Sequence, residues 1–78
     1  MIYHDLASAL QKAGIREDAY SLECGTPNES LVLCREGQQW QVYYSERGIK
    51  TGLKYFDSEE DAVDYFYQTL VHDPTTRI

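Results

Sequence analysis

The chain has few of the residues from which catalytic and metal sites are built. Its 78 residues include two cysteines and two histidines, and neither type is clustered as metal ligands require. No glycine-rich segment has the spacing of a phosphate-binding loop. Cys34 lies in an apolar segment, which does not favour the thiolate that a nucleophilic cysteine needs. We therefore predict that the protein is not an enzyme and has no catalytic residue, metal or cofactor.

Long apolar runs are also absent. No segment approaches the roughly 20 apolar residues that a membrane-spanning helix needs. The N-terminal segment MIYHDLASALQKAG lacks the charged leader and apolar run of a signal peptide. These observations predict a cytoplasmic protein with no membrane contact. In a reducing cytoplasm we expect Cys24 and Cys34 to be free thiols, while a single disulfide between them stays open as the alternative.

Basic side chains are scarce. Seven lysines and arginines stand against 13 acids, which gives a net charge of −6. This balance opposes nonspecific nucleic-acid binding, which depends on neutralising phosphates. It favours a basic partner, because complementary charges steer encounter, and it also keeps a small protein in solution. With 42% apolar and 26% charged residues, the composition predicts one globular domain over residues 1–78.

Hydrophobic periodicity predicts a helix, four strands and a second helix. The first helix covers residues 3–13, with Gly14 as its C-terminal cap and Ile15 folded back on Leu10. Strands are expected at 20–23, 30–35, 40–46 and 49–56. The second helix begins at 57 or 58 and ends before Pro74, and 75–78 form a short tail. We predict an α+β fold: a two-layer sandwich in which both helices cover one face of a four-stranded antiparallel sheet.

A two-residue turn at Arg47 and Gly48 sets the predicted register of the last two strands. In this register Val42 lies opposite Leu53, and Trp40 lies opposite Tyr55. The core face then carries Leu31, Leu33, Trp40, Val42, Tyr44, Leu53 and Tyr55. The other face is expected to be wet and to carry Val32, Cys34, Gln41, Tyr43, Ser45, Lys50, Gly52 and Lys54.

The second helix carries the first candidate binding surface on its outer side. Five acids fall within residues 57–64, and no lysine or arginine occurs between residues 55 and 76. The positive end of the helix dipole explains some of these acids, but like charges four residues apart, as at Glu60 and Asp64, repel. A solvated face is one interpretation. The other is a partner-binding surface made of Glu60, Asp61, Asp64 and Tyr67, with Glu46 at the hairpin tip as an outlying contact.

A weak basic patch on the open sheet face is the second candidate surface. It consists of Arg47, Lys50 and Lys54 beside Tyr43. Aromatic and basic side chains on a bare sheet can bind single-stranded nucleic acid or a peptide. Lysines also commonly protect exposed strands from pairing, and the acidic molecule repels phosphate, so nucleic-acid binding is the weaker hypothesis. A domain that dimerises through its sheet is a further alternative, and we expect a monomer or weak homodimer.

The segment VYYSERGIKTGLKYFDSEEDAVDYF resembles small bacterial immunity proteins found near polymorphic toxins. In those proteins a sheet ending in YYSERG…G…F precedes an acidic helix rich in aromatics, and DAYSLECGTPNESLVL at residues 18–33 is similar to the same pattern. The resemblance implies a cytosolic antidote that binds a cognate toxin domain and blocks its active site. Many such toxins are nucleases with basic grooves, which an acidic helix can occupy. No functional residue carries over from the family.

Overall fold

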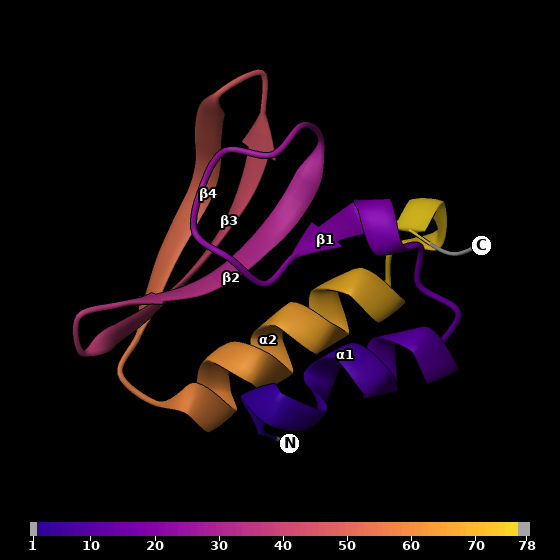
Figure 1. The fold of residues 1–78 in the computed structure, drawn as a ribbon, viewed down its shortest axis with the longest axis horizontal. Coiled ribbons are helices and arrows are strands. Elements are labelled where there is room, and N and C mark those ends of the chain that lie inside the picture. Colours follow the sequence, from indigo (N-terminus) through magenta and orange to yellow (C-terminus); the bar gives the residue numbers. More distant parts are fainter. Residues whose placement is uncertain (1, 77–78) are drawn as a thin grey trace.

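Two helices and a four-stranded sheet make up the described part of the chain, residues 2–76, in the computed structural model (Figure 1). The predicted α+β class is confirmed. The elements are α1 (Tyr3–Lys12), η1 (Glu17–Ala19), β1 (Tyr20–Ser21), β2 (Ser30–Glu36), β3 (Gln39–Glu46), β4 (Ile49–Phe56), α2 (Glu59–Val71) and η2 (Pro74–Thr76), where η marks a short 3-10 helix. Of the predicted tail at 75–78, residues 77 and 78 lie outside the described residues.

The sheet is mixed, so the prediction of a purely antiparallel sheet is wrong. Its strand order is β1-β2-β3-β4, and the last three strands are antiparallel. Strand β1 runs parallel to β2, with Tyr20 beside Leu31 and Ser21 beside Val32. A parallel pair needs a crossover in place of a tight hairpin. Residues 22–29 supply it by passing back over the strands before β2 begins (Figure 1).

A bulge in β4 overturns part of the predicted register. The turn itself is as predicted, with positive φ at both Arg47 and Gly48, and Tyr44 pairs with Thr51. Beyond that point Val42 pairs with Lys54, so one extra residue of β4 lies in the interval. Gly52 lies within this interval with φ of 65°, a left-handed conformation that glycine adopts without strain.

The bulge exchanges the faces of all later β4 side chains, because side chains alternate along a strand. Leu53 and Tyr55 are 39% and 56% exposed, and the prediction that they belong to the core is wrong. Phe56 lies opposite Trp40 instead and packs against the core. Lys54, expected on the open face, now lies on the same face as Val42.

The main core contains side chains from both helices and from β2 and β3. Its buried residues are Leu6, Leu10, Ile15, Ala19, Leu33, Trp40, Val42, Ala62, Val63, Phe66 and Leu70. Helix α1 ends as predicted, since Gly14 has φ of 76° and the Ile15 amide donates to the Leu10 carbonyl. Figure 1 shows the two helices side by side. This packing holds α2 in place and turns its acidic side away from the core.

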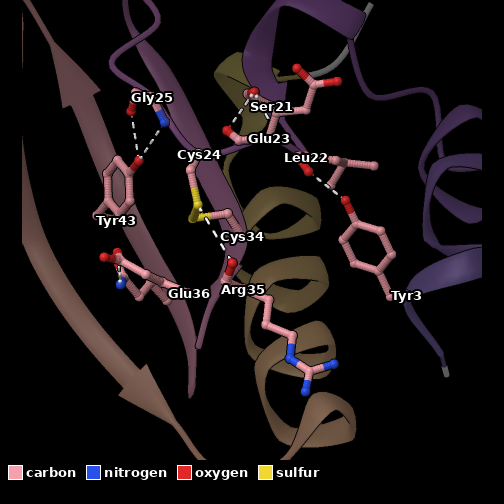
Figure 2. The surroundings of a disulfide bond; sticks show 11 residues. Tyr3, Ser21, Leu22, Glu23, Cys24, Gly25, Cys34, Arg35, Glu36 and Tyr43 are labelled. Carbon is pink, nitrogen blue, oxygen red and sulfur yellow. Dashed lines mark hydrogen bonds between the residues drawn. A yellow bond between two sulfur atoms is a disulfide. The ribbon is translucent and has the colours of Figure 1, made fainter. Parts of the chain in front are cut away.

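The other face of the sheet was predicted to be wet. Over β2 and β3 it is covered instead. Val32, Cys34 and Tyr43 form a second buried cluster there. Cys24 is bonded to Cys34, with Cα atoms 5.1 Å apart, so the expectation of free thiols is wrong. The disulfide joins residues 22–29 to β2, and the segment takes the place of solvent (Figure 2). The alternation of apolar and polar residues along the strands could not predict this cover, because the cover depends on the path of residues 22–29 across the sheet.

Candidate functional site

The acidic surface follows a capped first turn of α2. The Ser58 hydroxyl accepts a hydrogen bond from the Asp61 amide at 3.4 Å, which fixes the start of the helix. Two of the five acids are engaged within the fold. Asp57 accepts from the Gln39 side-chain amide at 3.3 Å, and Glu59 accepts from the Tyr3 backbone amide at 3.1 Å. These two carboxylates therefore connect α2 and the segment just before it to other parts of the fold.

Glu60, Asp61 and Asp64 are the remaining acids, and all three are exposed. Within residues 2–76 the one ion pair joins Arg16 to Asp18 at 3.2 Å, so these three carboxylates have no basic partner within 4 Å. Each is a charge that the fold does not neutralise. Several uncompensated charges of one sign on one side of a helix create a field that attracts a basic partner.

Tyr67 lies on the same side of α2 as two of the acids. Glu60, Asp64 and Tyr67 follow the spacing of four and three residues that stacks side chains along a helix. Tyr67 is half-buried and packs against the main core. This packing holds the residue in place beside the acids. The structure thus brings together four of the five predicted partner-binding residues, with Asp61 on the neighbouring ridge.

Glu46 does not belong to this surface. It is exposed and pairs with Ile49 at the β3–β4 turn, whereas α2 begins after the opposite end of β4 (Figure 1).

Tyr65 is closer to the acids and was not among the predicted contacts. Its ring lies 5.4 Å from that of Phe56, and the Lys54 ammonium lies 5.0 Å above it. The bulge, which returns Lys54 to the helix side, creates this contact.

The predicted basic patch is divided between the two faces of the sheet, and its aromatic residue is buried. Tyr43 is 1% exposed, so the expectation of an exposed aromatic is wrong. Its hydroxyl donates to the Gly25 carbonyl at 2.6 Å and accepts from the Gly25 amide at 3.2 Å (Figure 2). Lys50 stays on this face, with its ammonium 4.8 Å from the Tyr43 ring centroid, whereas Lys54 lies on the other. The Tyr43 ring is therefore not available for stacking in this state.

A pocket of about 450 Å³ lies near the end of α2. It is lined by Arg16, Ala19, Glu29, Leu31, Tyr44, Thr69, Leu70, Asp73, Thr75 and Thr76. Several of its polar groups already have hydrogen-bond partners. Arg16 donates to Asp18 and to the Thr75 carbonyl, and the Thr69 hydroxyl donates to the Tyr65 carbonyl. The bond from Arg16 to Thr75 holds η2 against the domain.

Hydrogen bonding perturbs one carboxyl at this pocket. Asp73 accepts from the Thr75 hydroxyl at 2.8 Å and from its amide at 3.0 Å. These bonds stabilise the ionised form and lower the pKa of Asp73, and the charge of Arg16 acts in the same direction. Burial raises the pKa of Tyr3 and Tyr20, each helped by a nearby glutamate. All three perturbations have structural causes.

Neither a membrane helix nor a metal cluster is found in the part of the chain that the structure describes. No helix there has the length and apolar character needed to cross a membrane. No three histidine, cysteine, aspartate or glutamate side chains there form a possible metal site. No family model matches the chain, and no curated protein or solved structure shows a significant match to it. The candidates for function are therefore the acidic side of α2 and the sheet face around Tyr43.

Proposed function

We propose that the protein is a non-enzymatic inhibitor that binds a basic protein partner through the outer side of α2, as an immunity protein binds its toxin. The observation that carries this proposal is the group of uncompensated carboxylates, Glu60, Asp61 and Asp64, on a helix held by the core. Tyr67 supplies an aromatic anchor beside them, the kind of residue that dominates interface energetics.

The geometry suits a partner whose own surface binds phosphates. Side chains four residues apart on a helix lie about 5–6 Å apart at Cβ, so Glu60 and Asp64 present two charges in a row. A basic nuclease groove would be attracted over several ångströms and then filled by the helix. Because α2 is already packed, little ordering entropy is lost when the partner binds.

The direct test is charge reversal at the acidic surface. Mixed with the protein encoded by the neighbouring gene, the wild-type chain is expected to co-purify as a complex. The triple variant Glu60→Lys, Asp61→Lys, Asp64→Lys should lose the complex while keeping its fold by circular dichroism. The matched control reverses Glu17, Glu23 and Glu29, which are exposed elsewhere, and changes the net charge equally. Equal binding by both triple variants would refute the acidic interface.

Dimerisation through the sheet is the less favoured function. Strand β4 forms one edge of the sheet and is exposed along nearly its whole length. It carries a bulge at Gly52 and two lysines, Lys50 and Lys54, and both devices protect edges from pairing. We therefore propose a monomer that meets its partner through α2, and light scattering at several concentrations measures this.

The cytoplasmic location belongs to the proposal as well. Disulfides persist in oxidising compartments and are rare where thiols are kept reduced. A protein that neutralises a toxin inside the cell would therefore meet reductants that can open the Cys24–Cys34 bond. Alkylation of thiols in freshly lysed cells, followed by mass spectrometry, would show which form is present. The acidic surface shares no residue with the disulfide, so the inhibitor proposal holds for either form.

A further inference from the structure

The segment at residues 22–29 is attached to the sheet by few contacts. Its ends are tied by the Tyr3 hydroxyl, which donates to the Leu22 carbonyl, and by the Ser30 hydroxyl, which donates to the Asn28 carbonyl. Between these ends, three features hold it: the Cys24–Cys34 disulfide, the pair of Tyr43 hydrogen bonds to Gly25, and the pair of hydrogen bonds between the Ser21 hydroxyl and the Glu23 backbone (Figure 2). Within residues 2–76, no backbone-to-backbone hydrogen bond holds residues 23–29.

The face beneath this segment differs from the helix-covered core. Its buried cluster is limited to Val32, Cys34 and Tyr43. Ser45, on the same face, is fully buried, and its hydroxyl has no hydrogen-bond partner among the described residues. A buried hydroxyl without a partner costs free energy that water would recover. This face is therefore less well satisfied in its closed state than a permanent core.

We propose that the Cys24–Cys34 disulfide is a reversible clasp, and that its reduction by a dithiol frees residues 22–29 and uncovers the sheet around Val32 and Tyr43. Opening joins these two side chains to Leu53 and Tyr55, which are already exposed. Tyr55 pairs with Gln41, so it lies on the same face as Tyr43. Reduction thus converts a covered face into a continuous apolar and aromatic strip beside Lys50. This device is separate from the acidic surface on α2.

The exposure of the two cysteines sets the course of the reaction. Cys24 is exposed, whereas Cys34 is 3% exposed in the middle of β2. A thiolate of the dithiol attacks the Cys24 sulfur, the S–S bond breaks, and its electron pair leaves on the Cys34 sulfur, which takes up a proton. The second thiol of the reductant then attacks the mixed disulfide, and Cys24 leaves and is protonated. Two electrons and two protons pass to the protein, and the reductant becomes a disulfide.

Once the bond is open, the closed state depends on the two hydrogen bonds to Gly25 and the two that join Ser21 to Glu23. Hydrogen bonds near the surface contribute little net stability, because water replaces them. The ordered segment, by contrast, loses conformational entropy at every residue. The balance therefore shifts toward the open segment, while α1, α2 and the main core keep their contacts.

Hydrogen exchange of the full-length protein, with and without dithiothreitol, tests the clasp. Reduction should speed exchange at the Gly25 amide by about tenfold or more. The α2 amides should stay protected, with exchange faster only to the extent that loss of the disulfide lowers the free energy of global unfolding, and reoxidation should restore the original rates. The variant Cys24→Ser, Cys34→Ser should behave like the reduced protein without any reductant. Tyr43→Phe with the disulfide intact is the matched control: the Gly25 amide, which loses its acceptor, should exchange faster, while the Glu23 amide should keep the rate of the oxidised wild type.

Two results would overturn the clasp. If exchange across residues 22–29 is the same in the reduced and oxidised proteins, the disulfide does not hold the segment closed. If α2 amides become as unprotected as those of the segment, reduction unfolds the domain, and the bond is a structural staple. Nitration of Tyr43 by tetranitromethane gives an independent readout, since the reaction needs an accessible ring. It should be faster in the Cys24→Ser, Cys34→Ser variant, which has no thiol to consume the reagent, than in the oxidised wild type.

Discussion

The outer side of α2 and the second face of the sheet were both candidate binding surfaces. They differ in how far their side chains are exposed and already bonded within the fold. On α2, Glu60, Asp61 and Asp64 are exposed and have no basic partner. On the sheet, Tyr43 is buried and bonded twice to Gly25, and Lys50 lies against its ring. A binding surface is better recognised by the interactions it leaves unsatisfied than by the residue types it contains.

The support of the two surfaces also differs. Helix α2 is held by a buried stripe of Ala62, Val63, Phe66 and Leu70, so its stability comes from apolar burial. The segment over the second face is held by a covalent bond and a tyrosine hydroxyl. Substitutions that remove either kind of support can therefore separate the two regions, and their expected effects fall in a clear order.

Phe66→Ala should have the largest effect. Phe66 is fully buried and contacts Tyr20 edge-on, with ring centroids 6.4 Å apart. Truncation of a buried phenylalanine costs about 3–5 kcal/mol, comparable to the whole stability of a domain this small, which is about 3–5 kcal/mol. Urea unfolding measures the change. Tyr55→Ala, at an exposed position, is the control and should change the free energy of unfolding by less than about 0.5 kcal/mol.

Removal of the disulfide should rank second. The bond closes a short loop, since its cysteines are 10 residues apart. Loops of this length give about 2–3 kcal/mol of stabilisation through the unfolded chain. Cys24→Ser, Cys34→Ser should lower the free energy of unfolding in urea by this amount under oxidising conditions and by nothing when both proteins are reduced. A loss that persists under reduction would point to packing of the sulfur atoms instead.

Tyr43→Phe should have a smaller effect than loss of the disulfide. The substitution keeps the ring in the second cluster and removes the hydroxyl that bonds Gly25. Because Gly25 is exposed and water can replace these bonds, we expect a loss of about 1 kcal/mol. Thermal unfolding of the oxidised protein checks it. A loss as large as that of the cysteine variant would mean that the Tyr43 hydroxyl holds the segment as strongly as the disulfide does.

The smallest effect is expected at the end of α2, from Asp73. Its pKa is lowered in the folded state by the Thr75 hydrogen bonds. A lowered carboxyl pKa contributes stability above the unfolded value, near 3.9, that is lost as pH falls through the folded value. The stability difference between wild type and Asp73→Asn should therefore shrink from neutral pH toward acid. A constant difference across this range, measured by urea unfolding, would contradict the assignment.

Local patterns in the sequence predicted the helices and the turn well. Gly14 ends α1, Ser58 caps α2, and Arg47 and Gly48 form the turn between β3 and β4. Each of these features depends on neighbouring residues alone, so the sequence pattern could predict it. The bulge at Gly52 was missed, although an isolated glycine within a strand pattern is a known sign of one. That single residue moved Leu53 and Tyr55 out of the core.

Long-range features were beyond the sequence pattern. Strand β1 has two residues, too few to show a period or a direction. The spacing of Cys24 and Cys34 permits a disulfide but does not require one. The burial of Tyr43 follows from the path of residues 22–29, which brings Gly25 to its hydroxyl. By contrast, the acidic side of α2 could be read from helical spacing, although the lack of ion pairs there required the structure.

The association rate with the protein of the neighbouring gene tests the central claim most directly. If uncompensated carboxylates on α2 steer a basic partner, the rate constant should fall by about tenfold or more as salt rises from low to high concentration. The Glu60→Lys, Asp61→Lys, Asp64→Lys variant should associate slowly at every salt concentration. A rate that is independent of salt and unchanged in this variant would contradict the account.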